Sequence, residues 1–289
     1  MVKRQKLVPA LRALAFGALA VSMLHAQTGA GPDAAKAVKA AADAMGMPRT
    51  GGPGGAGLPE VDVINRMEFW GSGTVAGGNG AAATKADYHA ALGYNPPAMR
   101  VEVTRTNPDS HTIQTVRDSY AWNESQIGAG LESGRGTATP VTNALKSRLL
   151  QLWILPYGVV KAAFAAGDQA KLSNENGANV LMFPLGGELA GITVKATLDA
   201  KNFITKVETR SDNPALSDLV READYSDYAD HGEILTDIKS PGHIVVKQGG
   251  NTVLDVQIKK WDANNPYLVF PVPQNVRNAG QESSKVAEK

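Results

Sequence analysis

The sequence predicts an α+β fold in which helices pack on the concave face of a strongly curved antiparallel β-sheet, an open half-barrel. From residue 61 onward, apolar and polar residues alternate with a period of two in several separate segments. Such alternation is typical of antiparallel strands with one dry face and one wet face. Residues 140–167 instead have the spacing of two apolar helices, which must cover an apolar surface. A sheet of about nine to eleven strands would provide it.

The first 26 residues have the pattern of a secretory signal peptide. A segment with four Lys and Arg residues precedes the apolar run ALAFGALAVSML, and a cleavage site fits between Ala26 and Gln27. The run is shorter than the roughly 20 residues that cross a bilayer as a helix. We therefore expect a periplasmic or secreted protein with no transmembrane segment in the mature chain.

The composition of the mature chain disfavours a nucleic-acid-binding function. The chain has 29 Lys and Arg against 28 Asp and Glu, and the signal contains four of the basic residues and none of the acidic ones. The mature net charge is therefore −3, so the chain lacks the excess of basic residues that is typical of nucleic-acid-binding proteins. The chain has no Cys, so an exported protein of this composition must be stabilised by its core and not by disulfides.

Residues 27–60 are predicted to form an Ala-rich helix and a flexible linker. DAAKAVKAAADAM, residues 33–45, has helical composition, and Gly46 follows where a helix would end. The Gly- and Pro-rich stretch GMPRTGGPGGAGLPE, residues 46–60, is typical of a linker. It lacks the Gly-Lys-Ser/Thr ending of a phosphate-binding loop.

The antiparallel domain is predicted over residues 61–276, and a disordered tail over 277–289. Four of its strands are expected in MRVEVT, ITVKATL, FITKVET and LDVQIKK. Their buried-face residues would be Met99, Val101 and Val103; Ile192, Val194, Ala196 and Leu198; Phe203, Thr205 and Val207; and Leu254, Val256 and Ile258. DAKN at 199–202 and QGGN at 248–251 suit short hairpins, which indicates a meander.

Residues 140–167 are predicted to be a helical insert in this domain. The apolar stripes are Leu145, Leu149 and Leu152 in the first helix, and Val160, Ala163 and Phe164 in the second. Pro156 separates the two helices and Gly167 ends the second. The pair would plug the concave side of the sheet.

The sequence contains no local motif for metal, cofactor or catalysis. The four histidines after the signal are too far apart for a pattern such as HExxH: His89, His111, His231 and His243. In DYSDYADHGE, residues 224–233, adjacent strand residues point to opposite faces, so this stretch is predicted to belong to a hairpin system, with Tyr225 and Tyr228 on opposite faces. GSGTVAG, residues 71–77, fits a loose dinucleotide fingerprint but has no βαβ unit around it. No G-x-S-x-G elbow identifies a nucleophile.

Several stretches resemble the N-terminal, non-catalytic region of exported bacterial metallo-β-lactamase-fold hydrolases. They are MEFWGSGTVAG, YNPPAMRVEVTRT, DSYAWNE, RLLQLWILPYGVVKAAFA, KVETRSDNPALSDLVREADYSDYADHG and HIVVKQGGNTVLDVQIKKWDANNP, in that order. The H-x-H-x-D-H motif of the hydrolase domain is absent, so no catalytic residue is carried over. The resemblance implies an accessory domain without its catalyst. Its architecture is similar to that of LolA-type lipoprotein carriers, in which a half-barrel covered by helices holds acyl chains.

Three function hypotheses follow, and the first is a non-catalytic binding module for a lipid or other apolar ligand. The residues expected to hold the ligand are Trp122, Leu149, Leu152, Trp153, Val160 and Phe164. The alternative interpretation is that these six side chains fill the core. The second hypothesis is an accessory domain that partners a separate metallo-β-lactamase-fold hydrolase. The third, a metal-dependent hydrolase in its own right, has no ligand pattern in its favour.

Overall fold

The computed structural model describes residues 31–47, 64–77, 82–230 and 237–287. The predicted signal peptide, the linker from residue 48 onward and His231 lie outside these described residues.

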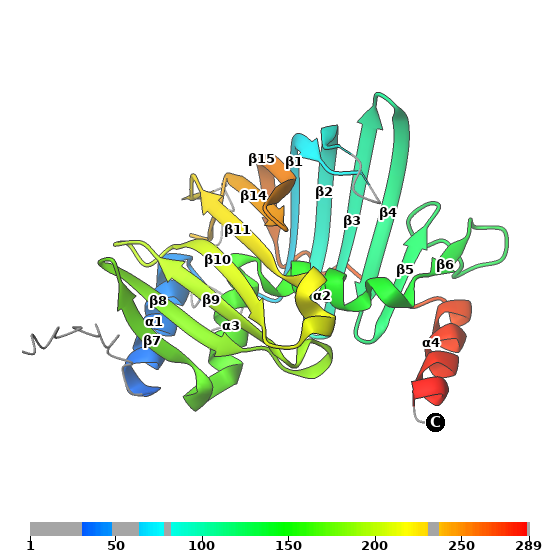
Figure 1. The fold of residues 1–289 in the computed structure, drawn as a ribbon. Coiled ribbons are helices and arrows are strands. Elements are labelled where there is room, and N and C mark those ends of the chain that lie inside the picture. The colour runs from blue at the N-terminus through cyan, green and yellow to red at the C-terminus, as the bar shows by residue number, and fades with distance from the viewer. Residues whose placement is uncertain (1–30, 48–63, 78–81, 231–236, 288–289) are drawn as a thin grey trace, which may run out of the picture.

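The described chain is built on one open, strongly curved antiparallel sheet of 13 strands (Figure 1). The strand order is β6-β5-β4-β3-β2-β1-β15-β14-β11-β10-β9-β8-β7, so β1 and β15 join two arms. The first arm contains β1 (Arg66–Val75), β2 (Thr84–Tyr94), β3 (Pro97–Thr106), β4 (Asp109–Arg117), β5 (Tyr120–Glu124) and β6 (Ala138–Pro140). The second contains β7 (Lys171–Glu175), β8 (Ala178–Pro184), β9 (Ile192–Leu198), β10 (Ile204–Ser211), β11 (Arg221–Ser226), β14 (His243–Gln248) and β15 (Asn251–Ala263).

This architecture confirms the predicted fold class, with more strands than the nine to eleven expected. The excess comes from short strands such as β5, β6 and β7, which extend the two edges of the sheet. A separate two-stranded ladder pairs β12 (Ala229–Asp230) with β13 (Lys239–Ser240). Both predicted hairpins are confirmed, because residues 199–202 connect β9 to β10 and residues 248–251 connect β14 to β15.

Two helices cross the concave face, as predicted for residues 140–167. They are α2 (Leu145–Trp153) and α3 (Pro156–Ala166), preceded by the short 3-10 helix η2 (Thr142–Ala144). Pro156 starts α3, and the chain bends by 94° between the two helical segments. Gly158 permits this tight corner, because a Cβ there would lie 2.6 Å from the carbonyl oxygen of Leu152. The Tyr225 hydroxyl donates a 2.7 Å hydrogen bond to the carbonyl of Ile154 at the corner.

The Ala-rich segment forms α1 (Gly31–Ala44) and belongs to the main core, not to a separate region before residue 61. Its small side chains are buried: Ala34, Ala37, Val38, Ala41 and Ala42. The helix contacts α3, β7 and β8, because alanines allow close approach of the backbones. Gly46 follows the helix with φ of +72°, and Lys239 N–H donates to Met45 O at 3.1 Å.

The C-terminal segment differs from the disordered tail predicted over 277–289. There α4 (Gln274–Ala287) forms a helix beside β5 and β6, at the right of Figure 1. Val276 is buried in a small cluster with Trp122, Ala138 and Val272, which holds the start of the helix. Asn275 Nδ2 also donates to Ala138 O at 2.7 Å.

In three of the four predicted strands, the residues expected on the buried face are buried. In FITKVET the buried positions are different. A bulge between Ile204 and Lys206 moves Ile204 to the buried face, while Phe203 and Thr205 are only half-buried. The prediction that Tyr225 and Tyr228 lie on opposite faces is also wrong. Asp227 between them has φ of +58°, which reverses the alternation, and both tyrosines pack on the main core.

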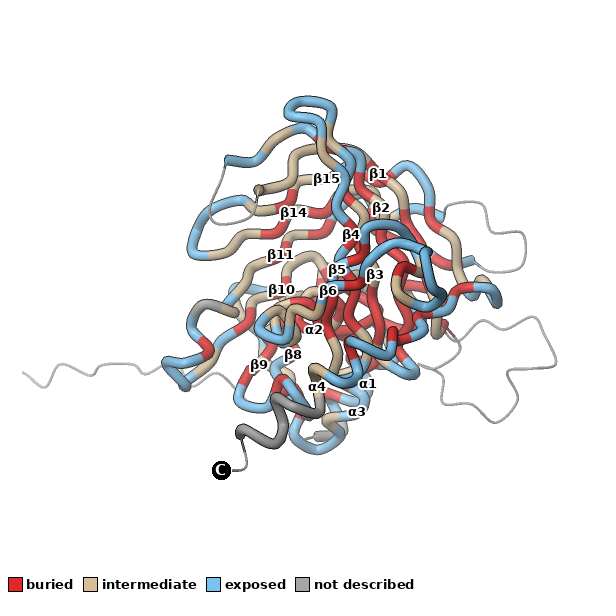
Figure 2. Tube along the Cα trace, turned by 90° about the vertical axis from the view of Figure 1, so that its right-hand side faces the viewer, coloured by how far each residue is buried: buried red, intermediate tan, exposed pale blue. Residues whose placement is uncertain are grey.

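The core lies between the sheet and the three helices on its concave side. In Figure 2 buried residues gather where helices and strands meet, and exposed residues follow the hairpin loops. In the described chain, no single helix is both long enough and apolar enough to span a membrane. The bent α2–α3 pair meets this length and composition only when its two helices are counted together.

Candidate functional site

A cavity of about 630 Å³ lies beside α2 and α3, between the two arms of the sheet. The β4–β5 turn and the start of β3 form one side of it, and the β8–β9 connection forms the other. The lining residues are mainly apolar: Pro97, Leu149, Trp153, Ala162, Ala165, Ala166, Pro184, Leu185 and Leu189, with Gly186 and Gly187. A hollow of this size and composition is typical of small-molecule sites.

Trp153, at the end of α2, is the large aromatic side chain of the cavity. It is half-buried, and its ring packs on the buried ring of Tyr94 with centroids 5.6 Å apart. Lys161 of α3 lies over the same Tyr94 ring, with Nζ 5.4 Å from the centroid. Trp153 is therefore held by contact with Tyr94 while it also lines the cavity.

Four polar residues complete the lining: Asp118, Ser119, Gln169 and Glu188. Asp118 lies in the β4–β5 turn and forms an ion pair with Arg117 at 3.4 Å. Glu188 lies on the short 3-10 helix η4 (Gly187–Leu189) and is exposed. An apolar hollow with a few polar groups can hold the chain of an amphiphile and leave its head near these groups.

Hydrogen bonds hold α2 and α3, which form part of the cavity wall, against the sheet. Arg148 is 9% exposed and donates through Nη1 to the carbonyls of Thr115 (2.9 Å) and Trp122 (2.6 Å). Burial lowers the pKa of its guanidinium to about 10. On the other side of the corner, Tyr157 donates a 2.8 Å hydrogen bond to Lys239 O. These bonds anchor α2 to β4 and β5, and α3 to β13.

The six predicted ligand-holding residues fall into three groups. Leu149 and Trp153 line the cavity. Leu152 and Val160 are fully buried in the main core behind it. The other two, Phe164 and Trp122, lie away from the cavity.

Phe164 and Trp122 are not brought to the cavity. Phe164 is 52% exposed, because Val159, Val160 and Ala163 form the buried side of α3. Trp122 points to the opposite face of the sheet from Ala121, and there it packs with Val276 and donates from Nε1 to Glu124 at 3.0 Å. Strand alternation around Ala121 and Trp122 could have identified this separation from sequence.

The remaining lining residues were not singled out from the sequence. Ala162, Ala165 and Ala166 carry no chemical signal in themselves, and the β8–β9 connection has no motif. The small side chains at the end of α3 leave the hollow unfilled. Gly186 and Gly187 add no side chain to it.

The outer face of the first arm carries a charged group centred on His89. Its Nδ1 lies 2.9 Å from Glu102 and its Nε2 lies 3.2 Å from Glu68. Burial lowers the pKa of His89, but the hydrogen bonds to Glu102 and Glu68 outweigh that effect and raise the pKa to about 9. The same bonds to His89 lower the pKa of both carboxyls. The ring of Trp70 stacks on His89 at 4.7 Å.

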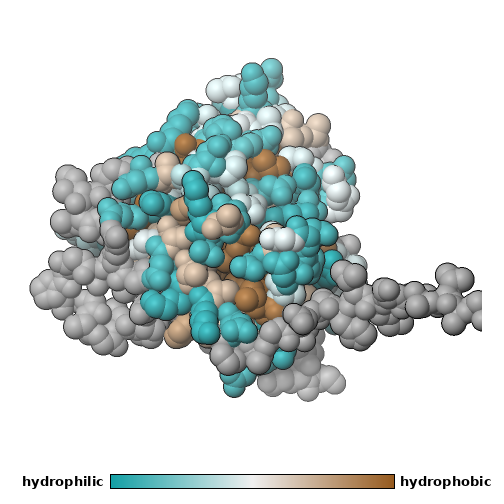
Figure 3. All heavy atoms as spheres, turned by 90° about the vertical axis from the view of Figure 1, so that its left-hand side faces the viewer, coloured by the Kyte–Doolittle hydropathy of each residue, from teal (hydrophilic) through white to brown (hydrophobic). Residues whose placement is uncertain are grey.

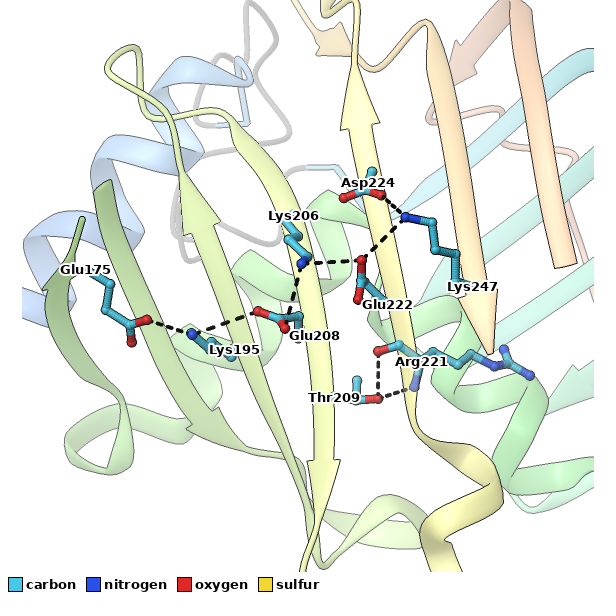
Figure 4. A network of polar contacts seen from close by, with 9 residues as sticks. All are labelled: Glu175, Lys195, Lys206, Glu208, Thr209, Arg221, Glu222, Asp224 and Lys247. Atoms are coloured by element: carbon cyan, nitrogen blue, oxygen red, sulfur yellow. Dashed lines mark hydrogen bonds and ion pairs between the residues drawn. The ribbon is translucent and has the colours of Figure 1, made fainter. Parts of the chain in front are cut away.

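The outer face of the second arm carries a ladder of ion pairs (Figure 4). Lys195 Nζ lies 2.7 Å from Glu175 and 3.8 Å from Glu208. The ladder continues across β10, β11 and β14 through Lys206, Glu222, Lys247 and Asp224. The side of the molecule seen in Figure 3 is dominated by hydrophilic residues, with smaller hydrophobic areas between them.

A second, smaller hollow of about 280 Å³ lies near the C-terminal helix, and the 125–135 loop and residues 267–273 form much of its wall. Four exposed large hydrophobic residues line it: Ile127, Leu131, Tyr267 and Val269. Leu268 and Phe270, between the exposed residues, pack inward on Ala91 and Ala98.

Within the described ranges, no three His, Cys, Asp or Glu side chains are grouped so that they could hold a metal ion. His243 pairs with Asp255 at 2.8 Å, and His111 lies 3.7 Å from Glu102. Gly71 and Gly73 of the loose dinucleotide fingerprint lie inside β1, against the backbone of β15. That segment is strand, not a phosphate-binding turn.

Neither a protein-family model nor a curated protein matches the chain. Among solved structures, it is similar to a LolA superfamily protein from Nitrosomonas europaea, at 10% sequence identity and a TM-score of 0.46, over 81% of this chain and 97% of that one. It is also similar to a DUF1329 family protein from Desulfovibrio piger, at 7% identity and a TM-score of 0.45, over 80% of this chain and 93% of that one. These likenesses are distant and concern the course of the chain only.

Proposed function

We propose that this protein is a non-catalytic binding module that holds a lipid or other apolar ligand in the cavity beside α2 and α3. The observation that carries the proposal is the apolar cavity of about 630 Å³, with Leu149 and Trp153 in its wall. It has the volume and the mainly apolar lining expected of a ligand site. The predicted signal peptide supports a periplasmic or secreted location for this activity.

Filling the cavity tests the proposal. Ala162 is half-buried in the wall, so Ala162→Trp would place an indole in the hollow. N-phenyl-1-naphthylamine, an uncharged dye that fluoresces in apolar surroundings, should bind the purified mature chain and lose most of its binding in this variant. Phe164→Ala is the matched control, because Phe164 lies on the same helix but is exposed and outside the lining. It should bind the dye as the unmodified chain does.

Overpacking could unfold the Ala162 variant, so thermal unfolding of each variant is recorded beside binding. Ala166→Leu, at the end of α3, is the milder alternative and should weaken binding without loss of cooperative unfolding. Dye binding by a folded Ala162→Trp chain at the unmodified level would overturn the proposal.

The second candidate role is an accessory domain for a separate metallo-β-lactamase-fold hydrolase, as the sequence resemblance implies. The hydrophobic surface around Tyr267 and Val269 supports an interaction role, since exposed apolar residues that gather in one place are typical of contact surfaces. If the cavity binds no apolar probe, copurification with such a hydrolase becomes the experiment of choice.

A further inference from the structure

We infer that the cavity selects amphiphiles with a cationic head, with the apolar chain inside and the cation near Glu188. This inference rests on the proposed function and specifies its ligand class.

The charges around the cavity favour a cation. Among the described lining residues none is Lys or Arg, while Asp118 and Glu188 are both acidic. Asp118 is partly neutralised by Arg117, at 3.4 Å. Glu188 is exposed and has no ion-pair partner within the described chain. The carboxylate of Glu188 is therefore the principal charge available to a ligand head at this opening.

The end of α3 adds to the same preference. Ala165 and Ala166, in its last turn, line the cavity, and Gln169 lies just beyond. The C-terminal end of a helix carries a partial negative charge, which favours cations nearby. The aromatic face of Trp153 in the same wall is also of the kind that attracts ammonium groups.

The basic side chains near the cavity are engaged by other groups. Arg117 pairs with Asp118 and donates through Nη1 to Phe270 O at 2.9 Å. Lys161 Nζ lies 5.4 Å from the centroid of the Tyr94 ring. Arg148 donates to Thr115 and Trp122, and Arg221 donates to Ser147 of α2. Neither arginine lines the cavity. An anionic head at the opening would meet Glu188 and the helix end without a facing cation from the lining.

The test compares three single-chain amphiphiles with the same twelve-carbon tail: dodecyltrimethylammonium, dodecyl maltoside and dodecyl sulfate. Each displaces N-phenyl-1-naphthylamine from the mature chain at concentrations below micelle formation. We expect the ammonium compound to displace the dye at a concentration about fivefold or more below that of the sulfate. An affinity ratio of this size is what a single exposed charge pair supplies. The maltoside should lie between them, and the preference should shrink in 0.5 M NaCl because salt screens exposed charges.

Charge reversal at one residue identifies the source of the preference. Glu188→Lys should invert the order of the ammonium and sulfate compounds, and Glu188→Gln should reduce the difference. Asp109→Lys is the matched control, since Asp109 is an exposed acidic residue at the start of β4, at the opposite end of that strand from the β4–β5 turn that lines the cavity. It should leave the order unchanged.

The outcomes separate the two proposals. If dye and amphiphiles bind equally well whatever their charge, and Glu188→Lys changes nothing, the cationic preference is wrong while the apolar site stands. If neither the dye nor any amphiphile binds, the proposed function fails and this inference fails with it.

Discussion

The concave and outer faces of the sheet differ in what covers them. Helices α1, α2 and α3 cover the concave face with apolar side chains, and a cavity remains at one end of that contact. The outer face carries the His89 group on one arm and the Lys195 ladder on the other. Apolar burial gives most of the free energy of folding, whereas exposed ion pairs give little. Substitutions on the two faces should therefore differ in size and in their response to pH and salt.

The largest effect is expected from the concave face. Leu152 is fully buried in α2, so Leu152→Ala should lower the free energy of unfolding by about 2 to 5 kcal/mol. Phe164→Ala, on the adjoining helix but 52% exposed, should change it by less than about 0.5 kcal/mol. Urea unfolding followed by circular dichroism measures both. A loss of about 0.5 kcal/mol or less in the Leu152 variant, on the scale of ordinary surface changes, would show that α2 is not part of the cooperative core.

A smaller, pH-dependent effect is expected from His89. Its pKa rises from 6.5 to about 9 in the folded chain, so the folded chain binds this proton more tightly than the unfolded chain does. The stabilisation is complete below about pH 6.5 and is lost as pH rises through about 9. The pKa of Glu68 and of Glu102 is lowered from 4.5 in the folded chain. The contribution of these two carboxylates to the free energy of unfolding is therefore complete above pH 4.5 and is lost as pH falls through their lowered pKa values.

His89→Gln removes this titration. The difference in unfolding free energy between the unmodified chain and the variant should shrink by about 1 to 3 kcal/mol from pH 6 to pH 10, as hydrogen bonds between charged groups weaken. Gln114→Ala is the control on the same sheet, because Gln114 is exposed on strand β4 and does not titrate. Its difference should stay constant over this range. An NMR titration that places the pKa of His89 near 6.5 would contradict the assignment.

The sequence was sufficient to predict those helices and strands whose structure is decided by neighbouring residues. Alternation identified the strands around Met99, Ile192 and Leu254, and Pro156 and Gly167 bounded the second helix of the insert. The bulge after Ile204 and the reversal at Asp227 depend on single backbone conformations, which residue alternation does not reveal.

The functional residues were only partly accessible from sequence, because they meet through tertiary contacts. Leu149 and Trp153 were predicted for their apolar character, but the alanines of α3 and Glu188 reach the cavity through the bend between the helices and the path of the β8–β9 connection. The His89 group depends on strand register, which pairs His89 with Glu102 on β3 and with Trp70 on β1. To find this group from sequence, the pairing register of the strands would have had to be predicted as well as their positions.

The smallest effect is expected from the ladder of the second arm. Lys195→Gln removes contacts with Glu175 and Glu208 near the surface, so the free energy of unfolding should fall by about 1 kcal/mol or less. In 0.5 M NaCl the loss should be smaller, because salt screens the contacts in the unmodified chain. Lys201→Gln, in the exposed β9–β10 turn and without an ion pair among the described residues, serves as the control. A salt-independent loss at Lys195 that matches the Leu152→Ala loss would mean that packing of the lysine stem, and not charge, stabilises the outer face.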